Sequence, residues 1–192
     1  YRWNFFFIWN NWFLIATQLE FIKSENITTA VTSVSIGTTS DKLFTTKYNT
    51  YCITGGLEQS STTFTDIHLN VIDNSGSVDT SGGAYSMAGM RLNSNASFNE
   101  MRSTAFGYAN GFFGIADFAP ENNGFVTYVI NPADSSSFTF FQGQTCSPID
   151  GNMRAEKTLG IHEVAEEIIG IRLITSNGSS SFTGKINIYG VL

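Results

Sequence analysis

Short runs in which hydrophobic and polar residues alternate recur along most of the chain. Thr65 to Ile72 alternates cleanly, Thr28 to Ile36 is rich in β-branched residues, and Phe125 to Ile130 stops at Asn131-Pro132. A period of two is typical of a half-buried strand, and the Gly, Asn and Pro clusters between the runs are typical of turns. The pattern predicts about nine or ten strands. The other expected strands include Phe13 to Lys23, Phe44 to Thr54, Ala84 to Leu92 and Ser137 to Gln142.

Glycine positions add two expectations about where strands stop. The third strand is predicted to end at Gly55-Gly56, because paired glycines usually mark a turn. Asp150 to Glu167 is the only segment with helical character, but Gly160 and Gly170 limit a helix there to a turn or two. We therefore expect this segment to be a long loop.

The end of the chain predicts a closing β-hairpin. Ile171 to Ser176 alternates as a strand does, and Asn177-Gly178 is typical of a tight turn. A second alternating run, from Phe182 to Tyr189, completes the pattern.

Strands at this density indicate one all-β domain, an antiparallel, jelly-roll-like β-sandwich. The chain has 192 residues, enough to bury a sizeable core. We expect the sandwich to span residues 13–192 and residues 1–12 to form a separate N-terminal segment. Because strands lie at both ends, the first and last are expected to pair in one sheet.

Charge and cysteine content exclude some classes of protein. Only 14% of residues are charged and the net charge is −6, without any run of Lys and Arg. Duplex nucleic acid and anionic membranes require a clustered basic face, so both are disfavoured as partners. The two cysteines, Cys52 and Cys146, do not make a disulfide scaffold. Two buried free thiols are the favoured interpretation, and a single bridge is the alternative.

All three tryptophans, Trp3, Trp9 and Trp12, lie in the first twelve residues among several phenylalanines. Asparagines interrupt the run, which disfavours a transmembrane helix, and the lack of a clear cleavage site disfavours a signal peptide. We expect an aromatic arm that anchors the protein to a neighbouring subunit or a larger assembly. The alternative is a stretch translated in the wrong frame, since a Trp codon read one base later encodes Gly.

Residue types suited to catalysis are few and scattered. His68 alternates with apolar neighbours and is expected to face solvent or a subunit boundary. His162-Glu163 is followed by Glu166-Glu167, so the H-E-x-x-H zinc motif is absent and a surface carboxylate cluster is the simpler interpretation. No nucleophile or phosphate-binding motif is present. The sequence predicts a protein that is not an enzyme and that requires no cofactor or metal.

One loop has a faint similarity to a calcium site. Asp73, Ser75, Ser77 and Asp79 place oxygen atoms at every second residue. Calcium prefers several oxygen ligands, but the usual closing Glu is missing. A turn stabilised by the Asp side chain is the commoner explanation.

Aromatic residues set among Gly, Asn and Ala are the best candidates for binding. Tyr85, Tyr108, Phe112 and Phe113 are candidate contacts for a glycan or for another subunit, because ring faces stack on sugar C–H groups. The favoured alternative is that these rings fill the core or a subunit axis, since most of the seventeen Phe must be buried.

Two motifs near the ends of the chain resemble a known group of proteins. Trp12-Phe-Leu-Ile-Ala-Thr-Gln18 is similar to the opening strand, and Phe182-x-Gly-x-Ile-x-Ile-Tyr-Gly to the final strand, of small β-sandwich proteins of tailed-bacteriophage virions. The resemblance implies a virion structural protein from a tail fibre, collar or capsid surface. It also implies a homotrimer that contacts other virion proteins, adheres to host-surface glycan, and is anchored to the particle through Trp3, Trp9 and Trp12. The alternative is a stand-alone carbohydrate-binding module or lectin.

Overall fold

The computed structural model describes residues 18–59, 65–95, 97–116, 122–149 and 152–192. These residues form twelve β-strands and no helix. The strands are β1 (Leu19–Val31), β2 (Ser33–Ile36), β3 (Thr50–Gln59), β4 (Thr65–Asp73), β5 (Tyr85–Asn93), β6 (Phe98–Phe106), β7 (Ile115–Ala116), β8 (Gly124–Ile130), β9 (Thr139–Ile149), β10 (Asn152–His162), β11 (Ile168–Thr175) and β12 (Phe182–Val191).

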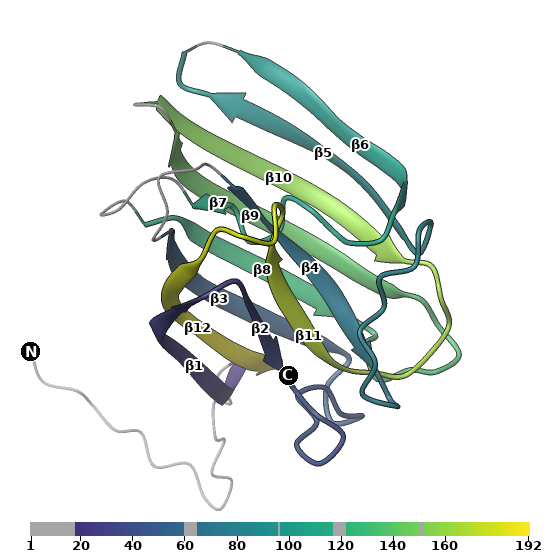
Figure 1. Ribbon diagram of the computed structural model, residues 1–192. Coiled ribbons are helices and arrows are strands. Elements are labelled where there is room, and N and C mark those ends of the chain that lie inside the picture. The colour runs from purple at the N-terminus through teal and green to yellow at the C-terminus, as the bar shows by residue number, and fades with distance from the viewer. Residues whose placement is uncertain (1–17, 60–64, 96, 117–121, 150–151) are drawn as a thin grey trace, which may run out of the picture.

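The strands make two antiparallel sheets that face each other (Figure 1). The large sheet has the order β1-β12-β3-β8-β9-β10-β5-β6, and the small sheet has the order β2-β11-β4-β7. The predicted all-β class and antiparallel sandwich are therefore confirmed. The first and last strands pair as expected, since β1 runs antiparallel to β12 from Leu19 opposite Val191 onward.

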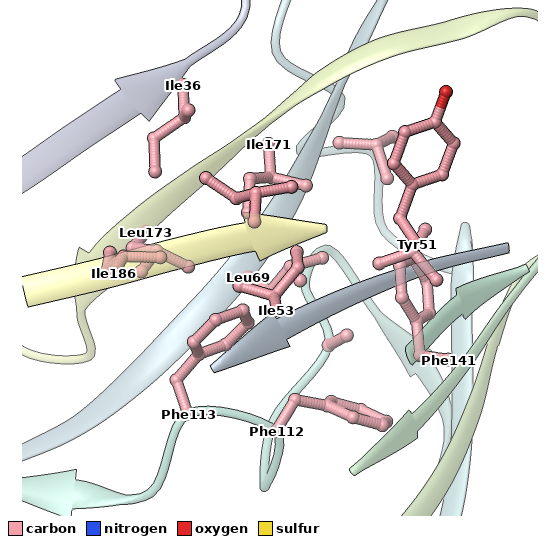
Figure 2. Close-up of a cluster of buried hydrophobic side chains, with 14 of the residues drawn as sticks. Ile36, Tyr51, Ile53, Leu69, Phe112, Phe113, Phe141, Ile171, Leu173 and Ile186 are labelled. Atoms are coloured by element: carbon pink, nitrogen blue, oxygen red, sulfur yellow. The ribbon is translucent and has the colours of Figure 1, made fainter. Parts of the chain in front are cut away.

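The core lies between the two sheets and is built by alternation. Inward-facing side chains of β4 and β11, such as Leu69 and Ile171, meet those of β3 and β12, such as Ile53 and Ile186 (Figure 2). All four are fully buried. At about 25 cal/mol for each Å² of apolar surface removed from water, this layer is the main source of stability.

The predicted closing hairpin is wrong, because its two strands belong to different sheets. β11 pairs with β2 and β4 in the small sheet, whereas β12 pairs with β1 and β3 in the large sheet. The loop between them crosses the edge of the sandwich. The side-chain oxygen of Asn177 accepts hydrogen bonds from the backbone N–H groups of Ser179 and Ser180, and the Thr175 hydroxyl donates to the Ser180 carbonyl. Both strands contribute buried side chains to the core between the sheets, such as Leu173 of β11 and Ile188 of β12.

Two other boundaries differ from expectation. β3 continues through Gly55-Gly56 to Gln59, because these glycines admit the neighbouring backbone: a Cβ atom on Gly56 would lie 2.8 Å from the Asn123 carbonyl oxygen. The segment expected to be a loop, 150–167, contains the eleven-residue strand β10. Gly160 does not interrupt β10, since the ring of Phe112 occupies the space that its side chain would fill.

The β5–β6 hairpin reaches beyond the small sheet (Figure 1). The side chains of Met87, Arg91 and Met101 point to the inner side of this hairpin but remain only half-buried. Arg91 Nε donates to Glu156 Oε1 of β10 at 2.6 Å, and the Glu156 side chain is only 2% exposed. This end of the large sheet is therefore held by strand pairing and a covered ion pair more than by the core.

Candidate functional site

Three of the four predicted contact residues lie in the core. Tyr85, Phe112 and Phe113 have at most 1% of their surface exposed. Phe113 packs edge-on against Phe125, with ring centroids 4.9 Å apart. The Tyr85 hydroxyl accepts from the Val71 N–H and donates to the Asp79 carbonyl. The expectation that these three rings contact a glycan or a second subunit is therefore wrong, and the alternative that they fill the sandwich holds for them.

Tyr108 is the one predicted contact that reaches the surface. Its ring stacks on His68 with centroids 3.6 Å apart and on Phe106 with centroids 4.9 Å apart. Phe106 is 36% exposed. His68 does not face solvent as expected, because Tyr108 covers it and leaves it 7% exposed. Burial lowers the pKa of His68, with partial compensation from Asp66, so the ring is neutral at pH 7.

The candidate anchors Trp3, Trp9 and Trp12 lie outside the described residues. Both cysteines are free. Cys52 is buried and burial raises the pKa of its thiol, whereas Cys146 is exposed. The expectation of free thiols is met, but only one of them is buried.

The side of the large sheet that faces away from the core is rich in exposed apolar residues. We call this side the outer face. Its exposed large hydrophobic side chains are Leu19, Phe21, Met90, Leu92, Phe98, Phe140, Met153 and Leu159. Strand registers make these residues neighbours: Leu92 lies opposite Phe98 on one side and Ala155 on the other, and Phe140 lies opposite Ile130 and Ile161.

One row of mostly apolar side chains on the outer face runs from β1 toward β10. Tyr128 lies opposite Cys52, Cys52 lies opposite Tyr189, and Tyr189 packs edge-on against Phe21 at 5.8 Å. The row through Leu159 joins this band, since Leu159 lies opposite Gln142, whose other neighbour is Tyr128. A face that gathers this many exposed apolar side chains is typical of an interaction site.

Charged residues on the outer face are few near this apolar patch. Lys157 of β10 lies opposite Met90, and Glu100 and Arg102 lie on the edge strand β6. Glu100 and Arg102 thus lie toward the edge of the face, and Lys157 lies among the apolar residues, a mixture that protein–protein interfaces also contain.

A second cluster lies at the end of β10. His162 is fully buried at the inner side of the sheet, and its ring packs against Tyr85 with centroids 4.9 Å apart. Its Nε2 atom lies 2.7 Å from Oδ2 of Asp79 and 3.7 Å from Oε1 of Glu166. Asp79 belongs to the loop after β4, and Glu166 to the loop between β10 and β11. Three segments that are distant along the chain therefore meet at one imidazole.

The two carboxyl groups of this cluster differ in their acidity. Burial raises the pKa of Asp79, but hydrogen bonds from His162 and from Ser81 outweigh it and leave the pKa below its ordinary value. Burial also raises the pKa of Glu166, and the negative charges of Asp73 and Asp79 raise it further, against a lowering effect of His162. The surface-cluster interpretation of this region is wrong for His162, which is buried between the sheets.

The loop with a calcium-like spacing has a structural explanation. Asp73 Oδ1 accepts hydrogen bonds from the backbone N–H groups of Ser75 and Ser77 and from the Ser75 hydroxyl. This is a turn stabilised by an Asp side chain, as the simpler interpretation expects. Asp79 turns away from that loop toward His162.

A shallow polar groove of about 620 Å³ crosses the large sheet near the β1 edge. Asn26, Glu58, Asn122 and Lys185 contribute polar side chains to it, and Gly56 and Gly184 keep its floor low. Its lining contains no aromatic ring for a sugar to stack on.

Comparisons with models of protein families, with curated proteins and with solved structures found no match to this chain. Among the described residues, no helix is long and apolar enough to cross a membrane. Three features of the structure remain from which a function can be argued: the outer face, the His162 cluster and the stacked rings of Phe106, Tyr108 and His68.

Sequence reasoning missed the outer face and the His162 cluster. A signal for the outer face is present in β10, where Met153, Leu159 and Ile161 are apolar on the side opposite Glu156 and Thr158. The glycines at 160 and 170 predict a loop here, and that prediction hides the alternation of β10. His162 and Glu166 lie four residues apart and are visible in the sequence, but Asp79 is 83 positions from His162 and no local motif joins it to them.

Proposed function

We propose that this protein is a structural component of a tailed-bacteriophage virion, located in a tail fibre, collar or capsid surface. It assembles as a homotrimer, takes part in building the particle, and contributes to adhesion to the host surface. The class of protein is taken from the resemblance of the segments at Trp12–Gln18 and Phe182–Val191 to virion β-sandwich proteins. The mode of action is assembly and binding without catalysis.

The observation that carries the proposal is the outer face. Side chains such as Phe98, Met153 and Leu159 are each more than half exposed in the single chain. Monomeric soluble proteins rarely expose large contiguous apolar patches, whereas subunits of permanent assemblies bury them against one another. The low content of charged residues, 14%, also favours a surface that meets other copies of the same protein. In this arrangement residues 1–12 attach the subunits to the particle.

Light scattering on the purified protein tests the assembly. The chain mass is 21.0 kDa, so a trimer has a mass of about 63 kDa. We expect this species at micromolar concentration and at high salt, because apolar contacts are not screened by ions. A monomer of 21.0 kDa that persists at the highest soluble concentration contradicts the proposal.

The assignment to a virion needs a separate test. Peptides of this chain should be recovered by mass spectrometry from intact tailed-phage particles that have been purified on a density gradient from a culture expressing the gene. Their constant ratio to a capsid protein across the gradient is the expected result. Recovery only from the soluble fraction would show that the protein is not part of the particle.

The alternative function, a carbohydrate-binding module, is favoured by one observation. The stacked rings of Phe106, Tyr108 and His68 lie beside the polar residues Asp66 and Asn110, and sugar sites combine ring faces with carboxylate and amide groups. A glycan array with the wild-type protein and with Tyr108→Ala tests it. Binding by a 21 kDa monomer that disappears in the variant would favour this function over the first.

A further inference from the structure

We propose that Asp79, His162 and Glu166 form a binding site for one divalent transition-metal ion, with Zn²⁺ as the best match. The three side chains supply one imidazole nitrogen and two carboxylate oxygens. Their donor atoms all lie within 4.8 Å of one another. The inference is independent of the proposed assembly, because none of the three residues belongs to the outer face.

The separations between the donor atoms fit a small metal ion. Zn²⁺ binds nitrogen and oxygen at about 2.0–2.2 Å, so two ligands of a tetrahedral site lie roughly 3.3 Å apart. Nε2 of His162 is 2.7 Å from Asp79 Oδ2 and 3.7 Å from Glu166 Oε1, which brackets that value. The carboxylate oxygens of Asp79 and Glu166 lie within 4.8 Å of each other, so side-chain rotations that bring them to about 3.3 Å would place all three ligands around one ion.

The three side chains differ in exposure, so the site has one ligand fixed by burial and one side that is open to solvent. The His162 side chain is 0% exposed, the Asp79 side chain is 12% exposed, and the Glu166 side chain is 29% exposed. The imidazole is held by the ring of Tyr85. An ion can reach the cluster from the Glu166 side, and a water molecule can complete a fourth position there.

The charge around the cluster also favours a cation. Two carboxylates meet one imidazole, and the negative charge of Asp73 adds to the field at Glu166, where these charges and burial raise the pKa. The neighbouring ammonium group of Lys42 is bonded to Glu167 and Asn74. A divalent ion would offset the excess of negative charge that the loops bring together.

The ligand types select a class of metal. Ca²⁺ and Mg²⁺ prefer oxygen ligands only, whereas imidazole suits Zn²⁺ and its neighbours in the first transition row. In the metal-free state Nε2 carries the ring proton, because the Asp79 carboxylate can only accept a hydrogen bond. On metal binding the Nε2 proton is replaced and the neutral ring carries its proton on Nδ1 instead. Nδ1 is buried without a hydrogen-bond partner, so we expect micromolar and not tighter affinity.

The bound ion would act as a clamp. It would join the loop after β4 and the β10–β11 loop to the end of β10, across a junction that the hydrogen bond from His162 to Asp79 now holds. Anything that binds only the folded state raises its stability, and a tenfold excess of Zn²⁺ over the dissociation constant should raise the Tm by about 3–6 °C for a chain of this size.

The test uses chelator-treated protein in a Cys146→Ser background, because an exposed thiol binds zinc by itself. Calorimetric titration with ZnCl₂ should give one ion per chain, and thermal unfolding should give the expected rise in Tm. Asp79→Asn and Glu166→Gln preserve shape and should each reduce the zinc affinity at least tenfold. Glu163→Gln, in the same loop but outside the cluster, is the matched control and should bind zinc normally. CaCl₂ at the same concentration should leave the Tm unchanged.

Each outcome of these titrations either supports the zinc site or overturns it. Loss of the zinc response in the two variants, but not in Glu163→Gln, supports the site. If the wild-type protein gives no heat of binding and no shift in Tm, the proposal is wrong. It is also wrong if Glu166→Gln and Glu163→Gln respond to zinc as the wild type does, because the ion must then bind elsewhere. Glu166 lies in a loop and is partly exposed, so its variant is expected to fold.

Discussion

At the scale of single residues, the position of His68 is decided by one neighbour. Its side chain points away from the core, but Tyr108 stacks on it and removes it from water. An uncharged ring is favoured there, because charging it would require burying a cation. The sequence predicts that His68 faces solvent or a subunit boundary, but it is buried within the single chain, so its protonation is coupled to folding.

This burial predicts a pH-dependent stability. Burial lowers the pKa of His68 in the folded state below its ordinary value of 6.5, so the unfolded chain binds a proton more readily. Stability from this group is present above pH 6.5 and is lost as the pH falls toward the folded-state pKa. Urea unfolding at pH 7.5 and at pH 5 should show a larger loss of stability in the wild type than in His68→Phe, which keeps the stack. An equal loss in the two proteins would assign the pH dependence to other groups.

At the scale of elements, the loop before β7 packs against β9 and β10 through the ring of one residue, Phe112. The ring of Phe112 lies over Gly143 of β9 and Gly160 of β10, and the Thr127 hydroxyl donates to the Phe112 carbonyl. A Cβ atom on Gly143 would lie 2.8 Å from the ring and 3.1 Å from the Phe112 backbone. The glycines in these strands therefore serve packing and do not interrupt the strands.

Gly143→Ala is accordingly expected to destabilise the protein by roughly 1–3 kcal/mol, the usual cost of overfilling a packed core. Gly82→Ala is the matched control, because nothing lies within 4 Å of a Cβ atom at that position. The control should change the free energy of unfolding by less than about 0.5 kcal/mol. Chemical denaturation of both variants measures the difference, and equal stabilities would contradict the packing argument.

The sequence predicts where strands lie more reliably than it predicts which strands pair with one another. Alternation in Thr65 to Ile72 and in Phe182 to Tyr189 identifies a strand and its buried side, because that pattern depends only on local periodicity. It does not say which strand lies alongside. The turn at Asn177-Gly178 is compatible with a hairpin within one sheet and with a crossing between sheets, and the latter is found.

The candidate sites were harder to predict for the same reason. The side chains of Tyr85 and Phe112 are surrounded in the sequence by small and polar residues, but tertiary packing buries both. The pairing of Asp79 with His162 depends on how a loop folds over a distant strand end. Only Tyr108 lies at the surface, because its segment runs along the edge of the small sheet and bonds to β4 through Ala109.

At the scale of the whole molecule, the large sheet carries large apolar side chains on both of its faces. The small sheet packs against one side of the large sheet, and the other side carries eight exposed large hydrophobic side chains. A central sheet that is apolar on both faces is typical of a layer that is covered twice. The second cover would have to come from another molecule, and in the proposed trimer it is another subunit.

The rate at which a thiol reagent modifies Cys146 measures whether assembly buries the outer face. Cys146 is exposed in the single chain and lies on the outer face opposite Ala155, whose other neighbour is Leu92. If assembly covers this face, a thiol reagent should modify Cys146 at least tenfold more slowly in the native protein than in Leu159→Glu, which places a charge in the interface. Ser35→Glu puts the same charge on the small sheet. It should leave the mass of the assembly unchanged and Cys146 slow to react.

Light scattering of the same samples links the two measurements. Leu159→Glu should shift the mass from about 63 kDa toward 21.0 kDa while Ser35→Glu stays assembled. The buried Cys52 thiol should remain slow in all three proteins and so reports that they are folded. A fast thiol in an assembled wild type would mean that the subunits meet through another surface. The outer face would then be free, and the edge strands β1 and β6 would become the surfaces to test next.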